Sequence, residues 1–332
     1  MSNEPKDAGT ASADPRSSAL RQAQGTEGAG RELWRRFTAT AQLRRWAVAS
    51  LVGNIGIVVT GALVRLTDSG LGCPTWPRCA PESYVPHPAY GIHGVIEFGN
   101  RLLTFVLAAI MILTFVTARR LQDREARPRA RTIALILLAG IPAQAIIGGI
   151  TVLTHLNPFA VALHMLASLA LICVNVLLVH RALGVRRQPV SGVQRALVRV
   201  TFGALAVAVW LGTVVTGSGP HAGDRDAVRT GFDPALLSHI HAAAVYVVMA
   251  ATIAGILWIR SRAAVLLLML LLGQAVIGIV QYNIALPVGL VLLHVLGAAV
   301  ITAAGAHYLM SVGKRAEQPR ATAPARPESA TV

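Results

Sequence analysis

Three histidines occupy positions from which they could bind iron inside a bundle of apolar helices. His164 and His294 end two copies of one pattern, QAIIGGITVLTHLNPFAVALH (144–164) and QAVIGIVQYNIALPVGLVLLH (274–294), and His241 lies near the start of another apolar run. Neutral imidazole nitrogens from two facing helices are the ligands that a six-coordinate haem iron needs. The alternative is that each histidine makes a hydrogen bond between helices. Because histidines recur at equivalent positions of a duplicated unit, we favour haem binding.

A second group of polar residues opens the apolar run HGVIEFGNRLL, which starts at His93 and contains Glu97, Asn100 and Arg101. Ionisable residues inside a bilayer are costly and usually face a cavity or a partner, so Glu97 is a candidate catalytic residue. It could carry a proton, or it could form a structural ion pair with Arg101 one helical turn away.

Arginines near the same predicted outer surface could bind carboxylates. Guanidinium groups pair with carboxylates in a bidentate manner, so we expect Arg65 and Arg101 to contact haem propionates. For Arg65 the alternative is anchoring at the membrane interface, where long basic side chains reach the polar layer.

Cys73 and Cys79 flank the segment PTWPR in a predicted outer loop, whereas Cys173 lies alone inside an apolar run. Disulfides persist on the oxidising side of a membrane, so we expect these two cysteines to be bonded. A zinc site would need more ligands than this loop offers. Both a structural and a redox-active role remain open for the pair.

The elements that position these residues are predicted to be membrane-spanning helices. Of the 332 residues, 54% are hydrophobic and only 14% are charged, which is typical of an all-α polytopic membrane protein. The net charge of +15 comes from basic loops that separate the apolar runs, so we do not expect nucleic acid as a partner. Each run is close to the ~20 residues that cross a bilayer, and eight runs are found: 46–64, 92–117, 132–153, 161–180, 200–217, 239–259, 263–283 and 288–311.

Alternate loops are rich in arginine, which places both chain termini in the cytoplasm. The motif VVTG also occurs twice, at 58–61 and 214–217. We therefore predict two parallel four-helix-bundle repeats, 46–180 and 200–311, related by an axis along the membrane normal. Residues 1–30 and 313–332 are predicted to be disordered cytoplasmic tails, because they contain few large apolar residues.

Together, these features resemble the haem A synthase family over residues 46 to 311. They are the eight duplicated helices, the outer-loop cysteine pair, EFGNR, and histidines in the fourth, sixth and eighth helices. The resemblance implies oxidation of the C8 methyl of haem O to a formyl group by successive hydroxylations. The cysteine pair of part of the family agrees with the expected disulfide between Cys73 and Cys79. Our own hypothesis is that Glu97 acts at the N-terminal haem pocket, as a proton carrier or by stabilising charge that develops at the oxidised methyl carbon.

The resemblance further implies two haem pockets with different contents. The C-terminal half would hold a haem b cofactor with His241 and His294 as axial ligands, and His164 in the N-terminal half would face the substrate haem. The family pattern opening the second helix is E-x-x-H-R, but Asn100 stands where the histidine is expected. His93, two turns earlier on the same face, could replace that ligand if the helix entry bends inward.

Two other functions compete with this interpretation. A membrane b-type cytochrome that only transfers electrons would explain the histidines but neither Glu97 nor an asymmetric N-terminal pocket. A transporter would suit the duplication, but no pair of interrupted helices lies near mid-membrane in the sequence. For a synthase we expect residence in the cytoplasmic membrane, with a haem O synthase, an electron donor and a second copy of the chain as candidate partners.

Overall fold

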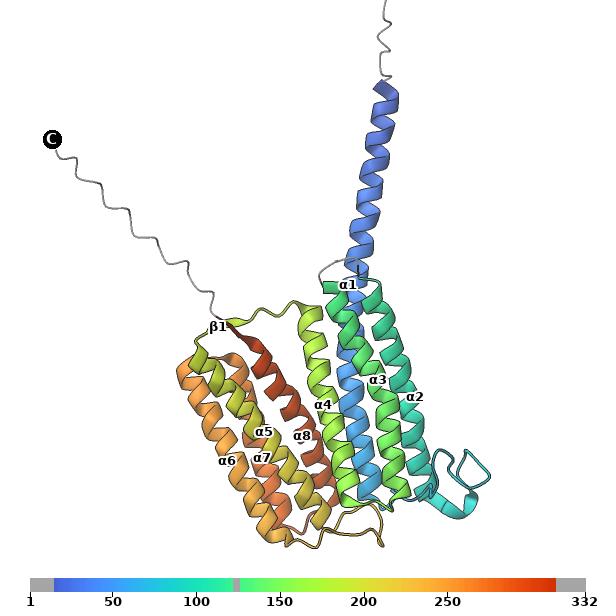
Figure 1. Ribbon diagram of the computed structural model, residues 1–332, viewed down its shortest axis with the longest axis vertical. Coiled ribbons are helices and arrows are strands. Elements are labelled where there is room, and N and C mark those ends of the chain that lie inside the picture. Colours follow the sequence, from blue (N-terminus) through green and yellow to red (C-terminus); the bar gives the residue numbers. More distant parts are fainter. Residues whose placement is uncertain (1–14, 122–125, 315–332) are drawn as a thin grey trace, which may run out of the picture.

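The computed structural model describes residues 15–121 and 126–314 (Figure 1). Within this part of the chain, eight helices are long and apolar enough to cross a membrane, which confirms the predicted all-α polytopic membrane fold. The helices are α1 (Pro15–Leu66), α2 (Gly91–Arg119), α3 (Ala126–Leu153), α4 (Pro158–Leu183), α5 (Gly192–Ser218), α6 (Pro234–Ile259), α7 (Arg262–Asn283) and α8 (Val288–Ser311). The short elements are η1 (Pro88–Tyr90), β1 (Gln188–Val190) and β2 (Val312–Lys314).

Proline and capping residues set the helix starts near the site. Asn157 accepts hydrogen bonds from the backbone N–H groups of Phe159 and Ala160, with Pro158 in the first turn of α4. Asp233 caps α6 in the same way, followed by Pro234. These caps satisfy backbone donors that have no partner inside the helix. The position of each helix start sets the depth of the histidine on that helix, His164 on α4 and His241 on α6.

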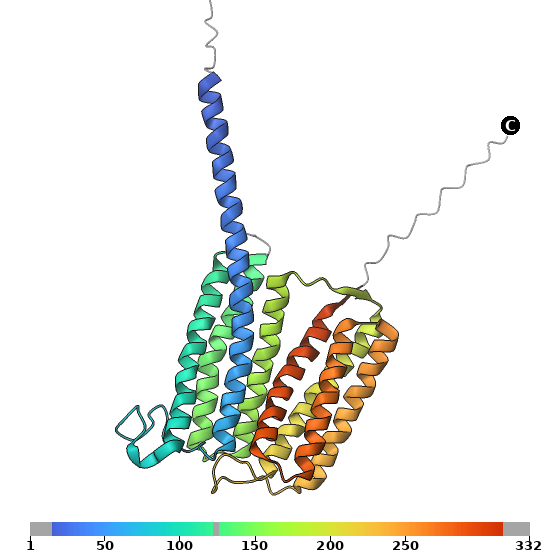
Figure 2. The ribbon, with the colours of Figure 1, turned by 180° about the vertical axis from the view of Figure 1, so that it is seen from behind.

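The helices form two groups of four, α1–α4 and α5–α8, which lie side by side (Figures 1 and 2). In the first group α1 packs on α2 and α4, and α3 packs on α2 and α4, so α2 and α4 face each other diagonally. The second group repeats this order, with α6 and α8 on the diagonal. The two groups meet through α1, α4, α5 and α8. Descent of the halves from one duplicated unit remains a prediction.

The ends of the chain differ from the predicted tails. Residues 15–30, expected to be disordered, form the first turns of α1, which runs continuously to Leu66. Alanine, arginine and glutamine make up seven of these sixteen residues, and they favour helix once a membrane span continues it. At the other end, residues 313 and 314 belong to β2, which pairs in parallel with β1. The rest of both predicted tails lies outside the described residues.

The basic and non-basic connections lie at opposite ends of the bundle. The start of α1, strand β1 and strand β2 share one end, and the long loops after α1 and α5 lie at the other (Figure 1). If each helix crosses the membrane once, loops that alternate between basic and non-basic must lie at alternate ends of the bundle, as they do here. The cytoplasmic location of that end stays a prediction.

Candidate functional site

The two histidines of the C-terminal half face each other across the bundle. The imidazole ring centroids of His241 on α6 and His294 on α8 are 6.5 Å apart, and their planes cross at 67°. A first-row metal binds an imidazole nitrogen at about 2.0 Å, as zinc does, so two imidazoles on opposite sides of one ion have centroids roughly 6 Å apart. The spacing therefore fits two axial ligands of a single haem iron.

Hydrogen bonding leaves these rings available to a metal. Nδ1 of His241 lies 2.8 Å from the backbone carbonyl oxygen of Ala208 on α5, and with Nδ1 as the donor the lone pair of Nε2 is free. Neither ring nitrogen of His294 has a hydrogen-bond partner among the described residues, and its Nδ1 is buried. An unpaired buried polar group is costly, and a metal bound by this ring would give one of its two nitrogens a partner.

Glycines give both rings room against neighbouring helices. A methyl group at Gly212 on α5 would lie 3.2 Å from Cε1 of His241, and one at Gly278 on α7 would lie 3.4 Å from Cε1 of His294. Small residues of this kind allow close helix approach in membranes. Larger side chains at these two positions would press on the ligand rings.

His164 in the N-terminal half has the surroundings of His294. A methyl group at Gly148 on α3 would lie 3.3 Å from Cε1 of His164, and Nε2 of Gln144 donates to the His164 backbone carbonyl at 3.3 Å. Gln274 donates to the His294 carbonyl at 2.7 Å in the same way. The ring nitrogens of His164 also lack partners among the described residues, and its Nδ1 is buried. The two histidines thus have matching contacts, and the duplication of the halves stays a prediction.

Asn100 is the α2 residue that corresponds to His241 when EFGNR is aligned with SHIHA. Its Oδ1 accepts a hydrogen bond of 2.8 Å from the hydroxyl of Thr60 on α1, and its amide lies beside Gly61. His93, the alternative candidate, is exposed, and its Nδ1 lies 2.9 Å from the hydroxyl of Ser69. The helix entry therefore holds His93 at the outer loop and not inside the bundle.

Glu97 is 5% exposed and both of its carboxylate oxygens are engaged. Oε1 pairs with Arg101 Nη2 at 2.5 Å, which is the ion pair that the sequence raised as the structural alternative. Oε2 accepts a hydrogen bond of 2.6 Å from the backbone N–H of Cys73. The carboxylate thus joins α2 to the cysteine loop.

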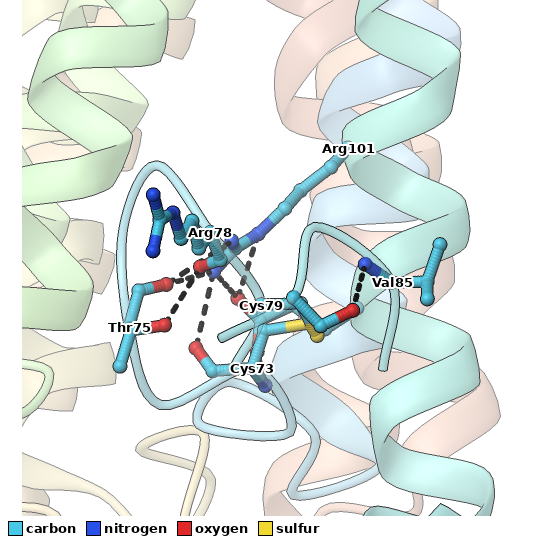
Figure 3. Close-up of a disulfide and its surroundings, with 8 residues drawn as sticks. Cys73, Thr75, Arg78, Cys79, Val85 and Arg101 are labelled. Atoms are coloured by element: carbon cyan, nitrogen blue, oxygen red, sulfur yellow. Dashed lines mark hydrogen bonds and ion pairs between the residues drawn. A yellow bond between two sulfur atoms is a disulfide. The ribbon is translucent and has the colours of Figure 1, made fainter. Parts of the chain in front are cut away.

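The predicted disulfide is present: Cys73 and Cys79 are bonded, with Cα atoms 4.4 Å apart. Arg101 reaches into the loop that they close and donates to the carbonyl oxygens of Cys73, Thr75 and Arg78 at 3.1–3.2 Å (Figure 3). Arg101 therefore holds this loop on α2 through its backbone. The sequence analysis expected Arg101 to contact a haem propionate, and its donors are instead shared between Glu97 and the loop.

Trp76, which the sequence analysis did not single out, connects the loop to α3. A methyl group at Gly149 would overlap the Trp76 indole, with Cε2 at 2.6 Å and Cγ at 2.8 Å. Gly149 follows Gly148, which borders His164. The only sequence signal for this contact was an aromatic residue within a short cysteine-closed loop, opposite a Gly–Gly pair.

Arg65 links the two halves at the outer end. Its Nη2 donates 2.7 Å to the backbone carbonyl of Thr216, near the end of α5. Cations at a helix C-terminus complement its carbonyls and dipole. Its Nε is buried without a hydrogen-bond partner among the described residues, so one donor of the guanidinium is unused.

Comparison with known proteins places the chain in a family. The model of a family of cytochrome oxidase assembly proteins, COX15-CtaA, matches residues 44–223. A haem A synthase of Lysinibacillus sphaericus is 38% identical over 129 residues, which cover 37% of this chain and 39% of that protein. One of Geobacillus thermodenitrificans is 30% identical over 157 residues, covering 47% and 48%. The match therefore spans less than half the length of these curated relatives. Because the family model covers more than half of the chain, the protein belongs to the COX15-CtaA family of cytochrome oxidase assembly proteins.

Proposed function

We propose that the protein is a haem A synthase, which oxidises the C8 methyl of haem O to a formyl group by successive hydroxylations. The observation that carries the proposal is the facing pair His241 and His294, spaced for one haem iron, in a chain whose relatives are named haem A synthases. The protein would act in the cytoplasmic membrane with both termini in the cytoplasm. A haem O synthase and an electron donor would be its partners.

In this proposal the two halves have different tasks. His241 and His294 hold haem b, which supplies one-electron transfer when bound. His164 binds the iron of the substrate haem O in the N-terminal half, and Gln144 fixes its backbone. Arg65, whose buried Nε has no hydrogen-bond partner among the described residues, is the candidate for a haem propionate.

Glu97 is proposed to serve the N-terminal pocket as a proton carrier or by stabilising positive charge at the oxidised carbon. Glu97→Ala should leave haem b bound and stop haem A formation. Because Glu97 also holds Cys73, Glu97→Gln is the sharper variant, since its amide oxygen can still accept the Cys73 hydrogen bond. Protease resistance of the loop would report its position separately from haem A yield.

Normal haem A yield from Glu97→Gln would remove the carboxylate from the mechanism. Loss of both haem A and loop protection would assign Glu97 a positioning role through the loop. Loss of haem A with an intact loop would support a direct role.

The main test is haem extraction and chromatography from membranes of a haem O-producing host, with and without the protein. Appearance of haem A is the expected result. Haem B bound to the purified protein with haem O unchanged, even when candidate electron donors are supplied, would favour the second candidate, a b-type cytochrome. That candidate is suggested by the histidine pair alone, which would suffice for electron transfer. Absence of any bound haem would contradict both.

A further inference from the structure

The N-terminal half differs from the C-terminal half at one axial position, and this difference predicts a separate ligand site. We infer that a haem bound in the N-terminal half has a single protein ligand, His164, and an open iron face toward Asn100 that takes small exogenous ligands such as carbon monoxide. This inference rests on the proposed function, because it needs a haem in that half.

The proximal side is equivalent in the two halves. His164 and His294 each lie six residues after the first residue of their helix, α4 and α8. Each has its backbone carbonyl bound by a glutamine and its ring against a glycine of the preceding helix. Both rings have a buried Nδ1 without a partner among the described residues. Residues so similarly placed should meet a haem iron in the same manner.

The opposite side is not equivalent. In the C-terminal half, His241 lies against Gly212, six residues before the end of α5. In the N-terminal half, Asn100 bonds Thr60, six residues before the end of α1. The repeated VVTG motif aligns Thr60 with Thr216, one helical turn beyond Gly212. The two diagonal helices therefore present these residues within about one turn of the same depth, one with an imidazole and the other with a carboxamide. An amide is a weak iron ligand beside imidazole, and the Asn100 oxygen is already engaged.

The Asn100 amide can still act toward a ligand. Its Nδ2 is a hydrogen-bond donor without a partner among the described residues, whereas its Oδ1 is held by the Thr60 hydroxyl at 2.8 Å. The Thr60 hydroxyl assigns Oδ1 as the acceptor, and Nδ2 lies 3.9 Å from the position of a methyl group at Gly61. A ligand on the open iron face would meet a neutral donor here.

Other described histidines of this half are committed elsewhere. His87 accepts a hydrogen bond from the Ala89 N–H, and His93 contacts Ser69 at the outer loop. His155 is exposed in the turn between α3 and α4. His180 bonds His307 on α8 at 2.7 Å, near the opposite end of α4. None of them is placed to supply the second axial ligand.

The test uses the full-length protein in lipid nanodiscs, titrated with haem B, reduced with dithionite and exposed to carbon monoxide. Haem content per chain and the carbon monoxide difference spectrum are measured together. Wild-type protein should bind two haems, and only the haem of the N-terminal half should bind carbon monoxide. His164→Ala should lose the responding haem.

Two mirrored variants exchange the axial residues. Asn100→His should keep both haems, abolish the carbon monoxide response and convert the high-spin iron signal to low-spin. His241→Asn should extend the response to the second haem. If Asn100→His fails to fold, His164→Ala and His241→Asn still decide the matter.

Two haems with no carbon monoxide response in wild-type protein would overturn the inference and leave the proposed synthesis of haem A standing. Carbon monoxide binding that persists in His164→Ala would mean that the open iron face belongs to another haem site, and it would overturn the inference as well. A single haem per chain, unchanged by His164→Ala, would overturn both the inference and the N-terminal pocket that the proposed function requires.

Discussion

At the scale of single residues, Arg101 makes the most varied contacts at the outer end of the N-terminal half. Its guanidinium binds one carboxylate and three backbone carbonyls, and the side chain is 22% exposed. A planar group with five donors can serve several acceptors in fixed directions, whereas an ammonium is a compact point charge. The loop that carries the disulfide is therefore also held without covalent bonds.

Arg101→Ala should release this loop and leave the Glu97 carboxylate buried without its counter-charge. Breaking a buried ion pair by removing one partner costs about 3 kcal/mol. We expect faster proteolysis between Cys73 and Tyr90 and a lower unfolding temperature. Arg101→Lys should fall between wild type and Arg101→Ala, since it keeps the charge but not the multiple donors. Unchanged proteolysis in Arg101→Ala would show that the disulfide alone fixes the loop.

Sequence reasoning reached part of this residue-level arrangement. The spacing of Glu97 and Arg101 allowed their ion pair as one of two alternatives, because residues four apart share a helix face. The hydrogen bond from Cys73 N–H to Glu97 and the Trp76 contact with Gly149 were not predictable. Both depend on how an irregular loop folds back on two helices, and no periodicity describes that path.

At the scale of elements, one side chain spans the diagonal between α6 and α8, away from the two histidines. A methyl group at Gly255 on α6 would overlap the hydroxyl of Tyr308 on α8, a side chain that is 1% exposed. Small residues permit such approach where the hydrophobic effect offers little driving force between helices. The distance between these two helices sets the separation of His241 and His294.

Gly255→Ala should therefore destabilise the haem-bound protein, because overpacking costs about 1–3 kcal/mol. Thermal unfolding followed by haem absorbance would measure it. Gly273→Ala on α7 is the matched control, since nothing lies within 4 Å of its added methyl group, and it should be neutral or stabilising by up to about 1 kcal/mol. Equal unfolding temperatures for the two variants would argue against close contact between Gly255 and the Tyr308 hydroxyl.

The apolar runs predicted that the eight helices exist, but not where each helix begins and ends. The run predicted at 161–180 is α4, which Pro158 opens and Gly184, with φ of 63°, closes. Strands β1 and β2 were missed, because three-residue strands carry little pattern and their partners are distant in sequence. The helical start of α1 was missed because polar composition was taken as a sign of disorder.

At the scale of the whole molecule, the two halves meet at an interface, here called the seam, which α1, α4, α5 and α8 form with both apolar and polar contacts. Its buried cluster comprises Val58, Leu169, Ile172 and Ala299, from α1, α4 and α8. Polar links lie at its two ends, with Arg65 on the Thr216 carbonyl at one and His180 on His307 at the other. These contacts should keep the two halves associated even when the α4–α5 connection is cut.

A protease site inserted in the exposed α4–α5 connection, between Gly184 and Gln188, tests this. After cleavage the two fragments should stay associated in mild detergent, as judged by co-purification through a tag on one of them. Ala299→Trp adds a large side chain at a fully buried position of the seam and should separate the cleaved fragments. Separation of the cleaved wild type would mean that the connection itself holds the halves together.

The pairing of β1 with β2 has a consequence for the order of events during synthesis. Strand β1 leaves the ribosome before α5, and its partner follows only after four more helices. Because chains are made from the N-terminus and halves can fold as they emerge, β1 must wait with unpaired backbone groups until translation has passed Lys314. A ribosome that stalls within α8 would thus leave an open strand edge at the membrane surface, a feature by which quality control could tell an unfinished chain from a finished one.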